Sequence, residues 1–177
     1  MTVKKTKEEK SRIAKRSKRK GSSAERSTAK ILKEWWGRGE WAKTPLSGGW
    51  SRAPGFNVAG DIVTTEKDFP WCVENKKVEK WELNQVLTNG SPIFLAWWQQ
   101  ASEQSPPNLA PLLIASKNRT QPIIAMKLDN WLDLLHNLPS DPYMVLHVNG
   151  EKLVITSLKT LTNIDPKTVK GYAIPEV

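Results

Sequence analysis

The sequence predicts an α/β protein in which helices flank a mixed central sheet. Apolar residues recur at helical spacing in three segments, and seven short apolar segments between and after them have the pattern of strands. The chain has 177 residues, of which 38% are hydrophobic, so one domain can bury a core of ordinary size. This composition excludes a wholly disordered chain.

The first predicted helix follows Gly21 and ends at Gly37 and Gly39. Its apolar and small positions recur every three or four residues: Ala24, Thr28, Ile31, Leu32, Trp35 and Trp36. A short extended segment, 41–44, precedes a loop at 45–60 that contains four glycines and two prolines. A loop of this length is long for a connector, so we expect it to be functional. Two strands are predicted at 58–64 and 71–76.

The second half of the chain predicts two more helices and two strand pairs. Ser91 and Pro92 indicate the start of a helix over 92–104. Strands are expected at 109–116 and 121–128, followed by a short helix that Asp129 caps. Asn149-Gly150 predicts a tight hairpin between strands 143–148 and 152–155. We expect one domain over 21–177, with residues 142–177 as a C-terminal hairpin extension.

The positive charge is concentrated at the start of the sequence. Residues 1–20 hold ten Lys or Arg and two Glu, whereas the other 157 residues carry a net charge of only +1. This basic arm (residues 1–20) has too few apolar residues for a core, so we expect it to be disordered when free. Such a segment favours salt-sensitive contacts with polyanions, although a solubilising tail or a targeting signal has a similar composition.

Several protein classes are excluded by what the sequence lacks. No apolar run approaches the roughly 20 residues of a membrane-spanning helix, and the first residues do not have a signal-peptide pattern. The single cysteine, Cys72, excludes an intramolecular disulfide and a cysteine-rich zinc site. We therefore expect a cytoplasmic protein without a membrane partner.

The chemistry-bearing residues lie around the second and third predicted strands. Asp61 interrupts an apolar strand, and an unpaired buried carboxylate is costly, so a functional role is favoured. In the next strand, Glu74 and Lys76 are two residues apart and share a face. If the strands are neighbours, Asp61 and Glu74 can converge as two oxygen ligands for Mg²⁺. Lys76 would then hold a phosphate or position a water nucleophile.

Four short motifs in this order resemble the archaeal-type Holliday junction resolvases of the PD-(D/E)XK nuclease superfamily, which has virus-encoded members. The motifs are Arg19-Lys20-Gly21-Ser22-Ser23-Ala24-Glu25, Ser47-Gly48-Gly49, Gly60-Asp61-Ile62-Val63 and Glu74-Asn75-Lys76. The match covers about residues 19–80. Gly60 stands where the superfamily usually has proline, and residues beyond 90 do not follow the compact archaeal enzymes.

The resemblance implies a PD-(D/E)XK core and a metal-dependent active site. By this resemblance Glu25, Asp61, Glu74 and Lys76 are catalytic, and Asp61, Glu74 and Glu25 hold Mg²⁺, for which Mn²⁺ would substitute. The helix at 92–104 resembles one in other superfamily nucleases whose glutamine faces the metal, and we favour Gln100 over Gln99. The implied activity is resolution of four-way DNA junctions by a homodimer, in the host cytoplasm if the source is viral.

The candidates for DNA contact lie in the glycine-rich loop, near the active-site strands and in the basic arm. Ser47 is implied by the resemblance, and Trp50 is the best candidate for stacking on unpaired bases. The remaining candidates are Lys43, Arg52, Lys77, Arg19 and Lys20.

Each interpretation has an alternative. Ser22 and Glu25 fit a capping box, so Glu25 could have only a structural role at the start of the helix. Glu74 and Lys76 could be an ordinary solvated pair. At the level of function, the alternatives are a repair, restriction or genome-processing nuclease that acts on linear or flapped DNA, and a basic DNA-binding accessory protein without catalysis.

Overall fold

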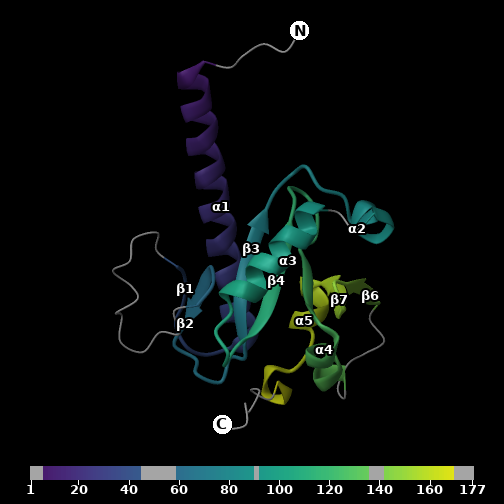
Figure 1. Cartoon of the computed structure of the whole chain (residues 1–177). Helices are drawn as coiled ribbons and strands as arrows, with labels where there is room; N and C mark the ends of the chain where they lie inside the picture. Colours follow the sequence, from purple (N-terminus) through teal and green to yellow (C-terminus); the bar gives the residue numbers. More distant parts are fainter. Residues whose placement is uncertain (1–5, 45–58, 90–91, 136–141, 170–177) are drawn as a thin grey trace.

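The computed structural model describes residues 6–44, 59–89, 92–135 and 142–169. Figure 1 shows the order of the helices and strands along the chain. These are α1 (Lys7–Trp36), β1 (Trp41–Lys43), β2 (Ile62–Thr64), β3 (Trp71–Lys77), α2 (Leu83–Asn89), α3 (Pro92–Gln104), β4 (Ala110–Ser116), β5 (Ile123–Lys127), α4 (Leu128–Leu135), β6 (Met144–Val148), β7 (Glu151–Ser157), α5 (Leu158–Thr162) and the 3₁₀ helix η2 (Pro166–Thr168).

The main sheet is mixed and has five strands in the order β3-β4-β5-β7-β6. β3 and β4 are parallel, with Glu74 opposite Leu113, and the other neighbours are antiparallel. The chain returns from β3 to the parallel β4 through α2 and α3, as parallel neighbours require a crossover. The predicted α/β class with a mixed, helix-flanked sheet is therefore confirmed.

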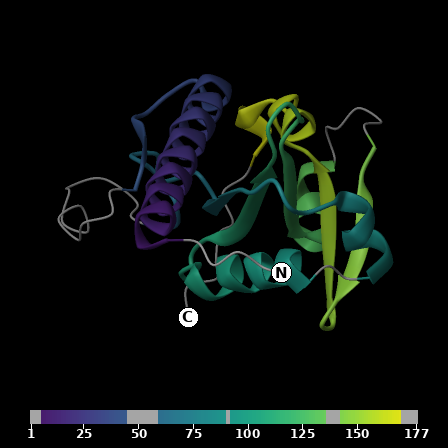
Figure 2. The ribbon, with the colours of Figure 1, turned by 90° about the horizontal axis from the view of Figure 1, so that it is seen from above.

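Helices cover both faces of this sheet, and strand alternation supplies a separate core to each face (Figure 2). On one face Leu32 of α1 and Trp131 of α4 pack with alternate sheet residues such as Val73. On the other face Phe94 of α3 packs with residues of the opposite set, such as Leu113. Because β3 lies at the edge of the sheet, side chains from both faces can meet there.

The first helix is much longer than the sequence predicts. It begins at Lys7 and runs for 30 residues, with Thr6 and Glu9 forming a capping box at its start. The expected disorder of the basic arm is therefore wrong for residues 7–20. Lys, Arg and Glu are good helix formers, and adding a residue to an existing helix costs far less than nucleating one. Gly21 lies within the helix, which ends at the left-handed Gly37.

The last two strands belong to the main sheet. β6 and β7 form the predicted hairpin, with Asn149 and Gly150 at φ values of 48° and 83°. β7 also pairs with β5 along five residues, and its buried Val154 and Ile155 contribute to both cores. The expectation of an appended hairpin extension is therefore wrong, because β7 is an interior strand whose removal would expose β5.

The two strands before β3 form a small sheet of their own. β2 pairs with β1 antiparallel, and its approach to β3 is a single bridge between Gly60 and Val73. Asp61 lies between this bridge and the start of β2, and is therefore held beside the edge strand β3. None of the helices in the described ranges combines the length and apolar character needed to span a bilayer.

Candidate active site

Acidic and basic side chains from three parts of the chain converge at the edge strand β3. α1 supplies Glu25, the segment before β2 supplies Asp61, and β3 itself supplies Glu74 and Lys76. These are the four residues predicted to be catalytic. The charge of Asp61 raises the pKa of both Glu25 and Glu74, so the three carboxyl groups lie close enough to interact electrostatically.

The position of Asp61 is fixed by backbone contacts. Its N–H donates to the carbonyl oxygen of Val73 at 2.7 Å, and its own carbonyl accepts from the Thr44 N–H at 2.8 Å. Gly60 has a φ of 75°, and a Cβ there would overlap the Val73 carbonyl oxygen. Glycine is therefore required before Asp61, both for the left-handed backbone and for the close approach to β3.

The carboxylate of Asp61 is held by the Glu-x-Lys strand. The backbone N–H of Asn75 donates to Asp61 Oδ2 at 2.8 Å. Because Asn75 lies between Glu74 and Lys76, this contact places Asp61 beside both of them. The convergence of Asp61 with the Glu-x-Lys motif, predicted for neighbouring strands, is therefore observed, although the two segments pair through a single bridge.

Glu74 and Lys76 form an ion pair on the face of β3 that α3 covers. The Glu74 side chain is buried, whereas that of Lys76 is one-fifth exposed. Lys76 Nζ also donates to Gln100 Oε1 of α3 at 2.9 Å. The neighbouring Gln99 is exposed and donates to Glu103 instead. Gln100 is thus the α3 glutamine that reaches the cluster, as the sequence favoured.

Glu25 reaches the cluster from the other face of the sheet. Its Oε2 lies 3.7 Å from Lys43 Nζ of β1. The alternative capping role for Glu25 is wrong, because the helix starts at Lys7 and Ser22 lies in its interior. Lys43, predicted only as a DNA contact, is here the cationic partner of Glu25.

Burial raises the pKa of all three carboxyl groups. Burial is the largest cause for Glu25, Asp61 and Glu74, and the Asp61 charge raises the pKa values of the other two further. The Asn75 N–H and the charge of Lys76 oppose the shift at Asp61, and the Lys76 hydrogen bond opposes it at Glu74. Three crowded carboxylates in a partly dry site are costly unless cations balance them.

Asn75 and Thr28 support the site, and the sequence analysis did not assign them a role. The buried Thr28 hydroxyl donates to Asn75 Oδ1 at 2.9 Å and so ties α1 to β3 one turn away from Glu25. Asn75 Nδ2 is buried without a partner in the described part of the chain. The sequence offered one signal for Asn75, because it is a polar residue on the same strand face as the apolar Trp71 and Val73.

Only some of the other predicted DNA contacts lie within the residues that the structure describes. Lys77 ends β3 and is half-buried, Arg19 is exposed on α1, and Lys20 forms an ion pair with Glu79. Ser47, Trp50, Arg52 and the predicted cap Ser91 lie outside the described residues.

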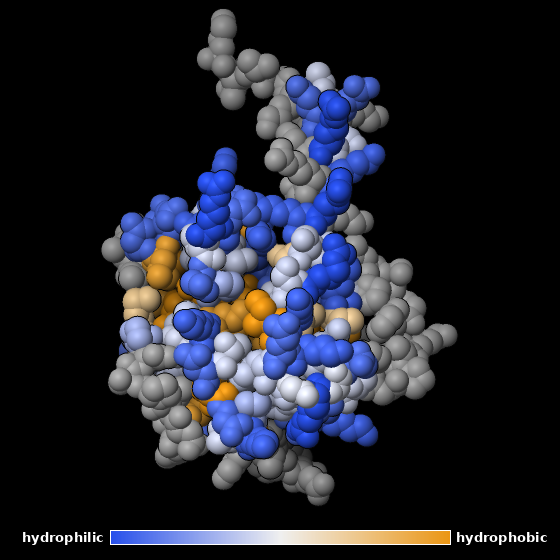
Figure 3. All heavy atoms as spheres, turned by 180° about the vertical axis from the view of Figure 1, so that it is seen from behind, coloured by the Kyte–Doolittle hydropathy of each residue, from blue (hydrophilic) through white to orange (hydrophobic). Residues whose placement is uncertain are grey.

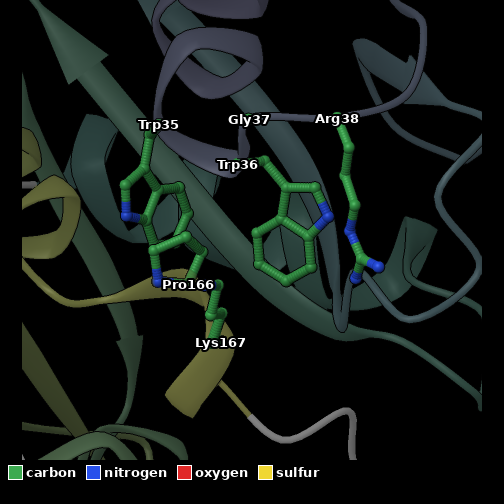
Figure 4. Close-up of a pocket in the computed structure, with 6 residues that line it drawn as sticks. All are labelled: Trp35, Trp36, Gly37, Arg38, Pro166 and Lys167. Atoms are coloured by element: carbon green, nitrogen blue, oxygen red, sulfur yellow. The ribbon is translucent and has the colours of Figure 1, made fainter.

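A pocket at the end of α1 contains none of the predicted site residues. It has a volume of about 570 Å³ and lies between Trp35, Trp36 and Arg38 on one side and Pro166 and Lys167 on the other (Figure 4). Arg38 is already paired with Glu66 and Asp68. The residues predicted to be catalytic therefore lie at the β3 edge and not in this pocket.

The donor set at the β3 edge fits a hard divalent cation. Mg²⁺ uses one or two carboxylates and keeps several waters, and the neighbouring Asp61 and Glu74 supply two such groups. In the described ranges, no set of three or more His, Cys, Asp and Glu side chains is arranged to hold a metal ion. A third protein ligand is thus not assembled, and Glu25 is instead next to Lys43.

The fold and this cluster together define the class of protein. A mixed sheet with helices on both faces, and Asp and Glu-x-Lys residues at its edge, is compatible with a PD-(D/E)XK nuclease core. A family model described as "Phage putative PDDEXK endonuclease" matches residues 16–171, so the chain belongs to this family of endonucleases. The superfamily predicted from the sequence is thus confirmed. Searches of curated proteins and of solved structures found no match.

Proposed function

We propose that this protein is a divalent-metal-dependent endonuclease that hydrolyses DNA phosphodiesters at the β3 edge. The observation that carries the proposal is the hydrogen bond from the Asn75 backbone to Asp61, which joins the two halves of the motif. The family match over residues 16–171 supports the same chemistry. Mg²⁺ is the proposed cofactor, and Mn²⁺ would substitute because it prefers similar oxygen ligands.

Asp61 and Glu74 are the proposed metal ligands, with Glu25 as a third acidic group near them. A divalent cation bound there would activate water and neutralise charge on the phosphodiester. Lys76, held by Glu74 and Gln100, is placed to donate a hydrogen bond to a phosphate oxygen or to the attacking water. Lys43 would balance Glu25 or contact a neighbouring phosphate.

For the substrate, we propose a four-way junction cut by a homodimer. The support is the resemblance of residues 19–80 to junction resolvases, and the need for two active sites to make paired symmetric cuts. The other candidate, cleavage of linear or flapped DNA, uses the same active-site residues. The non-catalytic accessory protein is disfavoured because all four active-site residue types are present and converge.

The test compares a four-way junction, a flap and a linear duplex of matched sequence, each with Mg²⁺ or with EDTA. Wild type and Asp61→Ala are assayed together, cut sites are mapped, and DNA binding is measured in EDTA. Paired symmetric cuts in the junction alone, lost in Asp61→Ala, are the expected result. Equal cutting of all three substrates would overturn the junction proposal. Absence of metal-dependent cutting by wild type would overturn the endonuclease proposal.

A further inference from the structure

The first half of α1 extends away from the rest of the molecule. Of the α1 residues whose burial is described, the first to be buried is Ala24, whereas Arg12, Lys15 and Arg19 are exposed. Figure 1 shows this half projecting past the end of the sheet, and Figure 3 shows a hydrophilic projection from the opposite side. We call residues 7–20 the helical arm.

The base of the helical arm is attached to two loops at the edge of the sheet. Lys20 forms an ion pair with Glu79, which follows β3. Glu79 also accepts from the backbone N–H of Asn118, in the turn between β4 and β5, at 3.2 Å. One carboxylate thus joins the base of the helical arm to both turns.

The base of the helical arm, at Lys20, lies near the proposed active site. Thr28 contacts Asn75, and Lys20 contacts Glu79, so α1 and β3 run in opposite directions. The helical arm therefore continues beyond the carboxyl end of β3, where Lys76 and Lys77 lie. DNA that leaves the site in this direction would run beside it.

The composition of the helical arm indicates a polyanionic partner. It contains eight Lys or Arg and two Glu, and Ile13 and Ala14 are its only apolar residues. Like charges three or four positions apart, as at Arg12, Lys15 and Arg19, repel each other, and phosphates would relieve this repulsion. A membrane-surface helix needs a broad apolar face, which two such residues cannot supply, so a nucleic acid is favoured over an anionic lipid surface.

A second group of cations surrounds the base of the helical arm. We call it the basic rim, and it consists of Lys77 at the end of β3 and of Lys80, Lys117 and Arg119 in the turns after β3 and β4. Glu82 pairs with Lys117 at 2.8 Å, whereas Lys80 and Arg119 are exposed. The basic rim therefore lies between Lys76 and the helical arm, so cations extend from the proposed active site to the arm.

We propose that the helical arm is a rigid duplex-binding element that holds substrate DNA on one side of the cut. This inference rests on the proposed endonuclease function. Fourteen helical residues span about 21 Å, which corresponds to about six base pairs. A disordered tail of the same charge would bind without a fixed reach, so helical rigidity makes a distinct prediction about the length of DNA that is contacted.

The charge is tested with the triple variant Arg12→Gln, Lys15→Gln, Arg19→Gln, since glutamine preserves helix propensity. DNA affinity is measured by fluorescence anisotropy in EDTA between 50 and 200 mM salt. Loss of three phosphate contacts should reduce the steepness of the plot of log K against log salt by up to about 2.7. It should also weaken binding about tenfold or more. The matched control removes Lys152, Lys159 and Lys167, three exposed lysines of the body, as glutamines. An equal effect of both triple variants, or no effect of the first, would overturn the inference.

The rigidity is tested with Ala14→Pro, which breaks the helix at an exposed position and leaves the charge unchanged. Ala14→Ser is its control. Hydroxyl-radical protection should shorten on one side of the cut by several of the six base pairs in Ala14→Pro, with an unchanged unfolding temperature. A footprint equal to wild type would overturn the rigid arm, and preferential binding to anionic vesicles would overturn the DNA partner.

These readouts separate the inference from the proposed function. Binding and protection are measured in EDTA and do not depend on cleavage. Arm-dependent binding without metal-dependent cutting would support the arm and overturn the endonuclease proposal. Metal-dependent cutting by wild type, together with DNA binding that does not depend on the arm, would support the endonuclease proposal and overturn the arm.

Discussion

The backbone N–H of Asn75 donates a 2.8 Å hydrogen bond to Asp61, so one contact joins the two separate parts of the candidate active-site motif. The donor is a main-chain group of the residue between Glu74 and Lys76. Asp61 therefore keeps its place whatever side chain occupies position 75, provided that β3 and the Gly60 bridge are intact. The side chains proposed to be catalytic are therefore distinct from the backbone groups of Gly60 and Asn75 that position Asp61.

Asp61→Asn should reduce the cleavage rate by about 10³-fold or more. The amide preserves the size and can still accept the Asn75 hydrogen bond, but it removes the negative charge that a divalent cation needs. Loss of several kcal/mol of charge stabilisation corresponds to several factors of ten in rate. Single-turnover cleavage in Mg²⁺ measures this, and DNA affinity in EDTA should stay within a few-fold. Near-normal cleavage would exclude Asp61 as a ligand.

The three raised carboxyl pKa values predict how stability depends on pH without metal. A carboxyl group whose pKa is raised by folding stabilises the fold below its unfolded pKa, near 4, and this contribution is lost as pH rises through the raised value. Asp61→Asn removes one such group. In EDTA it should be more stable than wild type at pH 7, and the difference should shrink as the pH falls through the raised pKa of Asp61. Denaturant unfolding at several pH values measures this, and a difference that grows on acidification would contradict the assignment.

Gly60→Ala should destabilise the protein by roughly 2–4 kcal/mol and impair cleavage. The new Cβ combines left-handed strain with overlap of the Val73 carbonyl oxygen. Gly150→Ala is the control, because Gly150 also has a positive φ but no atom within 4 Å of a built Cβ. It should cost about 1–2 kcal/mol and leave cleavage unchanged. Equal effects of the two substitutions on stability would show that close approach to β3 is unimportant.

Thr28→Val should cost about 1–3 kcal/mol, because it leaves the buried Asn75 side chain without its hydrogen-bond donor. Adding Asn75→Val should recover most of this loss, since replacing both polar partners by apolar groups can be nearly neutral. A double-mutant cycle of unfolding free energies tests the coupling. The double variant should keep cleavage activity, because the backbone donor to Asp61 remains.

Gln100→Ala should lower the cleavage rate by about 10- to 100-fold, in the range typical of groups that orient active-site side chains. It removes the α3 partner of Lys76 Nζ and leaves the ion pair with Glu74 to orient the ammonium group alone. Gln99→Ala is the matched control on the same helix, because Gln99 contacts Glu103. It should cleave at the wild-type rate. If both variants behave alike, Gln100 does not orient Lys76.

The sequence by itself determined the order of most elements and the residues of the candidate site. Period-two and helical patterns are local, so β3, α3, the later strands and the Asn149-Gly150 turn could all be predicted from short segments. Asp61 was recognised because a buried carboxylate in an apolar strand is costly without a role, and Glu74 and Lys76 because they share one strand face and match the Glu-x-Lys motif.

Tertiary structure decided what depends on partners distant in the sequence. Strand pairing put β7 beside β5 and made Asp61 meet β3 through one bridge, and no local pattern specifies either partner. The fate of the basic arm also depended on its context, because residues 7–20 extend a helix whose packed half, from Ala24 onward, supplies the nucleus. Local patterns set the elements and their chemistry, whereas long-range burial and hydrogen bonding set which residues face one another.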